Sequence, residues 1–249
     1  MQAWQNFVLL SAIIWSTQAH AVHSYNFLDQ VSCDIVLADS DQLSRAVYEQ
    51  ILIFVSGEPQ IQSALKSLHA KKRTGWLRRG IPPEQAESVL QHSEKVFRAA
   101  MEFPMNGRLN RARMAWMGYF HDLAEYIVFD YTPADQISST DKHKLERDVL
   151  EKLLLDKGGF GSLILELWNE YEQQITPESK IVMQLDKLDA GIQALEYDQL
   201  GFDVSEFFPY TEKKLTHPLL VQIFSDLTSN RRTTANFYEQ YFARLKRGN

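Results

Sequence analysis

Apolar residues in most of this chain recur every three or four positions, which is the spacing of an amphipathic helix. Two such stretches lie near residues 89–100 and 145–154, and the most regular one consists of Ile181, Leu185, Leu188 and Ile192. The alternating pattern of a half-buried strand is nearly absent after residue 60. The sequence therefore predicts an all-α fold in which helices pack through their apolar faces.

The start of the chain supports more than one interpretation. Residues 7–15 form an apolar run of signal-peptide length, and Ala19-His20-Ala21 has the small-x-small form of a cleavage site. No Lys or Arg precedes the run, which is shorter than the roughly 20 residues of a membrane span. Residues 1–21 are thus a signal peptide of a periplasmic or secreted protein, an apolar N-terminal helix, or the product of a start codon assigned too far upstream. No later segment is apolar and long enough to span a bilayer.

The rest of the chain divides into three predicted segments. Residues 22–45 show little periodicity, and the dense apolar residues from Val47 to Val55 fit a helix or a strand. We therefore predict a poorly constrained N-terminal extension over residues 22–55 and a helical domain over residues 56–235. Residues 236–249 are expected to form a charged tail, with Arg244-Leu245-Lys246-Arg247 in solvent.

Composition and charge exclude several classes of protein. The chain has 249 residues, of which 45% are hydrophobic and 23% charged, as in globular proteins rather than disordered ones. The net charge is −6 and no long basic stripe is present, so we expect no nucleic-acid polymer as a partner. The short basic clusters at residues 71–73 and 78–79 fit a phosphate group or, more commonly, a solvated loop. Cys33 is the only cysteine, which excludes an intrachain disulfide and a thiolate metal cluster.

The strongest chemical signal lies in residues 119–130, which contain an adjacent His121-Asp122 pair. Helical spacing of apolar residues from Met114 to Val128 predicts one continuous helix, with His121 and Glu125 on its buried face. A carboxylate that points into a core is costly unless it binds a cation or hydrogen-bond donors. This helix is therefore predicted to carry a site.

Two other predicted helices contribute similar groups, His92 and Asp186, beside their apolar stripes. A lone inward histidine is more often a hydrogen-bonded core residue, and a His-Asp dipeptide arises by chance in many chains. Together, however, two imidazoles and two carboxylates suit a divalent metal such as Mn²⁺, Co²⁺, Fe²⁺ or Zn²⁺. Such a metal activates water for hydrolysis of a phosphate ester, and Glu125 is placed to handle a proton.

The order of these residues, with several shorter motifs, resembles a known family. The motifs are residues 73–76, 87–89 with His92-Ser93, 121–125, 132–135, 141–144, 166–168, 170–172, 184–187 and 216–218. From Gly80 onward the chain resembles the HD-domain hydrolases, whose metal set is one His, an adjacent His-Asp and a distant Asp. The closer resemblance is to the 5′-deoxynucleotidase branch, the family of HD domain-containing protein 2, and it covers roughly residues 60–230.

The resemblance implies an HD-domain helical bundle and a role for each matching residue. The implied metal ligands are His92, His121, Asp122 and Asp186, with Co²⁺, Mn²⁺, Mg²⁺ or Zn²⁺ as the metal. Glu125 and Asp130 are implied to position water and the scissile phosphate, Arg73 to bind the phosphate, and Trp76 to exclude a ribose 2′-hydroxyl. The implied reaction converts a 2′-deoxynucleoside 5′-monophosphate to the deoxynucleoside and phosphate, in a cytoplasmic homodimer.

Two positions depart from the family pattern. Gln91 stands where an acidic residue usually precedes the first metal-binding histidine, and Phe129 stands where a glycine usually precedes Asp130. Phe129 is expected to narrow the pocket or shift Asp130. The alternatives are another phosphate ester or nucleotide as substrate, or a non-catalytic module that senses nucleotides. Asp189 and His217 are interpreted as structural.

Overall fold

The computed structural model describes residues 42–104 and 109–248. Apart from one isolated bridge between Lys72 and Ser88, the regular structure of these residues is helical, so the all-α prediction is confirmed. None of the helices in this part of the chain is both long and apolar enough to cross a membrane. The interpretations of residues 1–21 lie outside the described residues.

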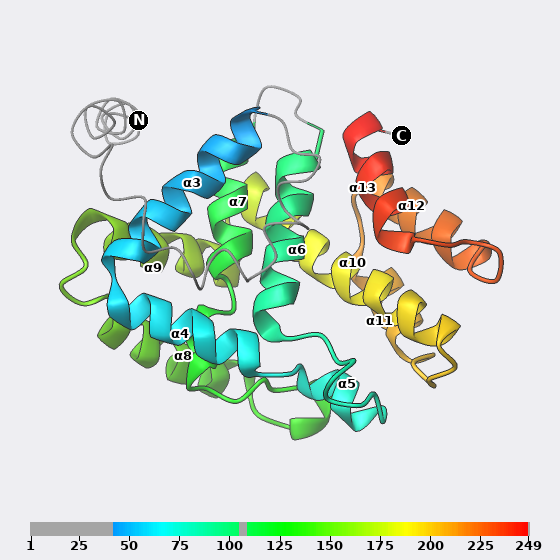
Figure 1. The fold of residues 1–249 in the computed structure, drawn as a ribbon, viewed down its shortest axis with the longest axis horizontal. Coiled ribbons are helices and arrows are strands. Elements are labelled where there is room, and N and C mark those ends of the chain that lie inside the picture. Colours follow the sequence, from blue (N-terminus) through cyan, green and yellow to red (C-terminus); the bar gives the residue numbers. More distant parts are fainter. Residues whose placement is uncertain (1–41, 105–108, 249) are drawn as a thin grey trace.

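The helices form a bundle around α6, α7 and α10, with α3, α4, α8 and α9 at one end and α11–α13 at the other (Figure 1). In chain order they are α3 (Gln42–Gly57), α4 (Pro59–Ala70), α5 (Thr74–Arg78), α6 (Val89–Glu102), α7 (Arg111–Phe120), α8 (Ser139–Leu154), α9 (Gly158–Gln173), α10 (Pro177–Gln199), α11 (Phe207–Lys214), α12 (Pro218–Ser229) and α13 (Phe237–Arg247), with short 3₁₀ helices η1 (Leu123–Tyr126) and η2 (Pro133–Asp135).

Local sequence fixes where the central helices begin and how closely they approach. Ser88 and Gln91 form a reciprocal capping box at the start of α6, and Thr176 and Ser179 do the same for α10. Helix α7 can approach α6 closely because residue 118 is glycine: a Cβ atom there would lie 3.1–3.2 Å from atoms of Val96 and Phe97. This close approach lies one turn before the end of α7, where His121 follows.

The prediction of one continuous helix through Val128 is wrong. Helix α7 ends at Phe120, and the chain continues as the 3₁₀ turn η1. Beyond the break, Nζ of Lys71 donates to the backbone oxygens of Glu125 and Val128 and so holds the η1 turn in place. The apolar spacing could not reveal this contact, which comes from 54 residues before Glu125.

Both ends of the described chain pack into the bundle. The dense apolar segment from Val47 to Val55 is part of α3, and Val47, Tyr48, Ile51, Phe54 and Val55 are buried. The final part of the predicted N-terminal extension, from Gln42, therefore lies against the core.

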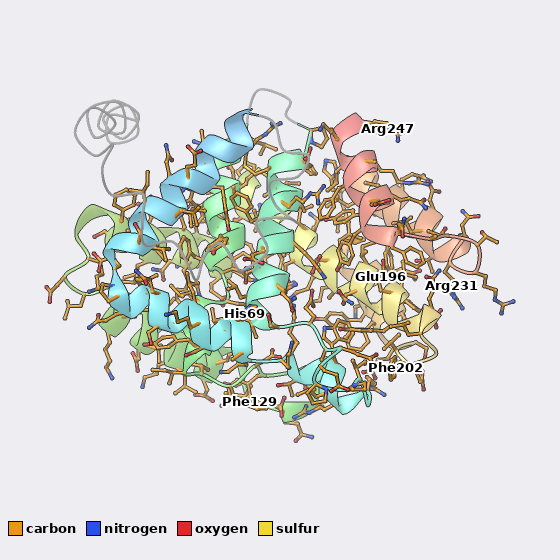
Figure 2. The ribbon with its side chains drawn as sticks, in the orientation of Figure 1. His69, Phe129, Glu196, Phe202, Arg231 and Arg247 are labelled. Atoms are coloured by element: carbon orange, nitrogen blue, oxygen red, sulfur yellow. The ribbon has the colours of Figure 1, made fainter. Side chains whose placement is uncertain are left out.

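The expectation of a solvated tail is also wrong, since residues 237–247 form α13. Its buried residues are Phe237, Tyr241, Phe242 and Leu245, and the Arg98 guanidinium lies 4.1 Å above the Phe242 ring. These buried residues have helical spacing in the sequence, but the basic residues between and after them favoured a solvated tail. Arg247 lies at the outer end of α13 (Figure 2).

This packing generates a stability prediction. Leu245→Ala should lower the free energy of unfolding by about 2–5 kcal/mol, because it opens a cavity under a fully buried side chain. The neighbouring exposed Lys246→Ala should change it by no more than about 0.5 kcal/mol. Urea unfolding followed by circular dichroism measures both values. Equal values for the two variants would restore the solvated-tail interpretation.

Candidate metal centre

Side chains from three separate parts of the chain meet inside the bundle. His92 comes from the first turn of α6, His121 from the residue after α7, and Asp186 from the middle of α10, and their ligand atoms lie within 4.8 Å of one another. All three are buried. Asp122, the fourth predicted ligand, is half-buried and lies 3.1 Å from Nε2 of His121 and 4.0 Å from Nε2 of His92. The structure thus brings the four predicted ligands together.

Hydrogen bonds at the outer nitrogens determine which nitrogen of each imidazole faces the centre. Nδ1 of His121 donates to the backbone oxygen of Gly118 at 2.9 Å, and Nδ1 of His92 donates to Oδ2 of Asp189 at 2.7 Å. In a neutral imidazole the other nitrogen, Nε2, then carries a lone pair. Both Nε2 atoms face carboxylates.

This arrangement requires a cation. Nε2 of His92 lies 3.1 Å from Oδ1 of Asp186, and Nε2 of His121 lies 3.1 Å from Oδ2 of Asp122. Each pair joins two acceptors in a buried place, which is unfavourable unless a proton or a metal ion lies between them. Ligands about 2.1 Å from one metal ion, at right angles to each other, lie about 3 Å apart. The residues present therefore fit a divalent metal ion.

The electrostatics of the site agree with that conclusion. Burial and Arg73 lower the pKa of His92, but hydrogen bonds to Asp186 and Asp189 outweigh both and raise it to about 9. Burial opposes ionisation of Asp186, yet Lys187 at 2.8 Å and His92 hold its pKa well below the usual range. The pKa of Asp122 is also lowered, because His121 outweighs the effect of burial. Without a metal, a proton on His92 neutralises part of this negative charge.

Next to the metal group lie two buried polar atoms without a hydrogen-bond partner among the described residues: Nη1 of Arg73 and Oε2 of Glu125. Burial lowers the pKa of Arg73, but the negative charges of Asp130, Glu87, Asp122 and Asp186 outweigh it and raise that pKa, so the guanidinium lies within electrostatic range of the metal group. Burial and the charges of Asp122 and Asp130 raise the pKa of Glu125 well above its usual value. A guanidinium N–H without a partner and a protonatable carboxyl near a cation suit an anion that exchanges protons.

Polar contacts tie the segment of Arg73 to the segment of Glu125. The backbone N–H of Thr74 donates to Oδ2 of Asp130 at 2.6 Å, and Arg78 makes a bidentate contact with Asp135. Lys71 holds the η1 turn from the same side. Asp130, one of the two predicted catalytic carboxylates, is therefore buried against the start of α5, where it links the Arg73 segment to the Glu125 segment.

Trp76 is enclosed rather than open to solvent. Its side chain is 1% exposed, its Nε1 donates to Oε2 of Glu87 at 3.1 Å, and its ring packs 4.4 Å from the Phe207 ring. The exclusion of a ribose 2′-hydroxyl by Trp76 stays a prediction.

The two departures from the family pattern have structural explanations. Gln91 uses its amide oxygen to accept the backbone N–H of Ser88 in the capping box, at 2.9 Å, as a glutamate carboxylate would. Phe129 is 48% exposed and packs edge-to-face on Tyr131, whereas Asp130 is buried (Figure 2). Phe129 therefore has a half-exposed ring while Asp130 keeps its bond to Thr74, and the expectation that Phe129 narrows the pocket or shifts Asp130 stays a prediction.

Comparison with known proteins identifies the family. A family model described as an HD domain matches residues 65–219. The chain belongs to the HD-domain family. The match runs from α4 into the start of α12 and includes every residue of the metal centre.

Relatives of this HD-domain protein include named enzymes. The 5′-deoxynucleotidase HDDC2 of Danio rerio is 37% identical over 177 residues, covering 69% of this chain and 86% of the relative. The 5′-deoxynucleotidase hdd1 of Schizosaccharomyces pombe is 30% identical over 190 residues, covering 73% and 90%. A conserved hypothetical protein from Pyrococcus furiosus has a solved structure with a TM-score of 0.53 and 26% identity, covering 70% of this chain and 98% of its own.

Several residues of this HD-domain site were not predicted from the sequence. The hydroxyl of Tyr171 donates to Oδ2 of Asp186 at 2.5 Å. Nζ of Lys142 lies 3.2 Å from Glu146 and 4.0 Å from Glu125. Asp189 contacts His92. The sequence contained one signal for Asp189: it lies three residues after Asp186 on the same helix, and therefore on nearly the same face.

The metal centre generates a binding prediction. Metal-stripped protein should bind Co²⁺, and His121→Ala should weaken binding more than about 100-fold, since even loss of an outer partner of a ligand costs 10–100-fold. His217→Ala is the matched control, because the His217 ring packs on the Phe103 ring and is not part of the metal group. A Co²⁺ titration monitored through the Co²⁺ absorption bands measures the affinity of each variant. Equal affinity of the two variants would exclude His121 from the site.

Proposed function

We propose that this protein is a metal-dependent phosphomonoesterase that hydrolyses 2′-deoxynucleoside 5′-monophosphates to deoxynucleosides and phosphate. The names of its relatives support this substrate class. The observation that carries the proposal is the buried group of acceptors that requires a cation, together with two buried atoms that have no partner among the described residues, Nη1 of Arg73 and Oε2 of Glu125. Cation, guanidinium and protonatable carboxyl are the three groups that hydrolysis of a phosphate monoester needs.

The roles follow from the positions of the side chains. His92, His121, Asp122 and Asp186 would hold the metal, which, when bound, supplies activation of water and polarisation of a phosphoryl oxygen. Arg73 binds the phosphate through its free Nη1. Glu125 takes the proton of the attacking water and returns one to the departing O5′ atom, as its raised pKa permits. The new P–O bond forms to water as the P–O5′ bond breaks, and Asp130 holds the Thr74 end of α5 in place.

The donor set also bears on the metal. Two imidazoles and two carboxylates favour Mn²⁺, Co²⁺, Fe²⁺ or Zn²⁺ over Mg²⁺, which prefers an all-oxygen octahedral shell. The homodimer and the cytoplasmic location implied by the family resemblance stay predictions.

A phosphate-release assay tests the reaction. Metal-stripped protein reloaded with Co²⁺, Mn²⁺, Mg²⁺ or Zn²⁺ should release phosphate from deoxynucleoside 5′-monophosphates, more slowly from the ribo compounds, and not from 3′-monophosphates. Glu125→Gln should lower kcat by about 10²–10⁴-fold, the usual contribution of general acid–base catalysis, while Co²⁺ stays bound. A wild type that binds metal and nucleotide yet releases no phosphate would show a sensor module. Release from all compounds alike would contradict the deoxynucleotidase assignment.

The exposure of Phe129 generates a separate prediction. Phe129→Gly, which restores the usual family residue, should leave the ratio of kcat/KM for deoxy over ribo substrates unchanged, because the ring is half-exposed and packs on Tyr131. Trp76→Phe is the matched comparison and should lower that ratio, since it loses the bond to Glu87 that fixes the ring. The same phosphate assay measures both ratios. A change of more than about tenfold for Phe129→Gly, equivalent to 1.4 kcal/mol, would return Phe129 to the pocket.

A further inference from the structure

Asp189 is a buried carboxylate for which the proposed mechanism has no direct use. It lies on α10, three residues after Asp186, and is 0% exposed. Its Oδ2 accepts the Nδ1–H of His92 at 2.7 Å, and its Oδ1 has no hydrogen-bond partner among the described residues. A carboxylate without solvent is costly, and a neutral side chain would fill the same space at lower cost. Its bond to His92 therefore needs a functional explanation.

Charged and polar groups from several elements surround Asp189. Nζ of Lys95 contacts Oε1 of Glu87 at 2.8 Å and Oε1 of Gln193 at 2.5 Å. Burial, together with Glu87, raises the pKa of Asp189, although the hydrogen bond with His92 and the charge of Lys95 oppose this shift. From α13, the Tyr238 hydroxyl donates to the backbone oxygen of Asp189 at 3.4 Å, and the Tyr238 ring lies 4.1 Å below Nζ of Lys95. Helix α13 thus packs against the residues around Asp189, on the side of His92 away from Asp186.

We propose that Asp189 is a positioning residue for the metal centre. By accepting the Nδ1–H of His92, it fixes the imidazole tautomer and the ring orientation, so that the lone pair of Nε2 faces Asp186 and Asp122. A carboxylate partner also makes the imidazole a stronger donor to a metal than a neutral partner does. His121 receives the same orientation from the backbone oxygen of Gly118, which carries no net charge. The two histidines are therefore unequal ligands, and His92 is the stronger one.

This inference rests on the proposed function only for the metal and is independent of the substrate. A merely structural Asp189 would be replaced without loss by the isosteric Asn. Under our proposal, Asn either accepts more weakly or turns its NH₂ group toward Nδ1, which moves the proton to Nε2 and blocks the metal. A structural role and a positioning role of Asp189 therefore predict different metal affinities for the Asn variant.

The experiment is a Co²⁺ titration of the metal-stripped full-length protein, as wild type and as Asp189→Asn. We expect the dissociation constant to rise 10–100-fold in Asp189→Asn, as for other outer partners of metal-binding histidines. The melting temperature of the metal-free variant should stay near that of wild type, and kcat should recover toward wild type at saturating Co²⁺. Asp198→Asn is the matched control: it removes a carboxylate from the same helix, paired with Arg231 at the surface, and should bind Co²⁺ as wild type does.

Wild-type affinity in Asp189→Asn, or the same loss in Asp198→Asn, would overturn the proposal. Should Asp189→Asn fail to fold, nitrogen-correlated NMR of the imidazoles in the Zn²⁺-loaded wild type decides the question without a variant. The proposal requires the His92 proton on Nδ1, and a proton on Nε2 overturns it. A wild type that binds Co²⁺ but releases no phosphate would contradict the proposed reaction and leave the role of Asp189 intact.

Discussion

The structure depends on one electrostatic constraint: two buried imidazole nitrogens with lone pairs face two carboxylates at about 3 Å. Four acceptors in a dry interior repel one another, and removal of their hydration is expensive. A cation removes both difficulties. The core of the bundle can therefore carry this group only because a metal or a proton completes it, and binding of a metal to the folded protein stabilises that state.

The fold meets this constraint through elements that are short and individually capped. The capping box at Ser88 places His92 in the first turn of α6, Gly118 brings α7 against α6, and the break after Phe120 turns Asp122 toward Nε2 of His92. A longer α7 would rotate each following residue by about 100° and would direct Glu125 differently. The bonds from Lys71 to two backbone oxygens beyond the break hold the turn that carries Glu125 and are thus part of the construction of the site.

Sequence reasoning could find the fold class and the metal residues because both have local signatures, a helical period and the spacing of His and Asp motifs. It failed where the cause lies elsewhere in the chain. Lys71 holds the η1 turn from a distant position, and the partners of α13 lie on α6, α10 and α12. Phe129 lies in a segment without regular structure between η1 and η2, where helical spacing carries no information. Asp189 looked like a polar residue beside an apolar stripe until the position of His92 was known.

Selectivity between substrates must arise outside the metal group, because a cation polarises any phosphoryl oxygen that reaches it. Glu87 connects the Arg73 segment to Trp76 and Lys95. Its backbone oxygen accepts the N–H of Arg73, and its carboxylate accepts hydrogen bonds from Trp76 and Lys95. Trp76 also packs against the rings of Tyr197 and Phe207, which restrict its movement. A fixed ring discriminates against an added hydroxyl by steric exclusion, whereas a mobile one would adapt to it. If Trp76 excludes a ribose 2′-hydroxyl, as the family resemblance implies, the rigidity supplied through Glu87 is what would let it distinguish a deoxyribose from a ribose.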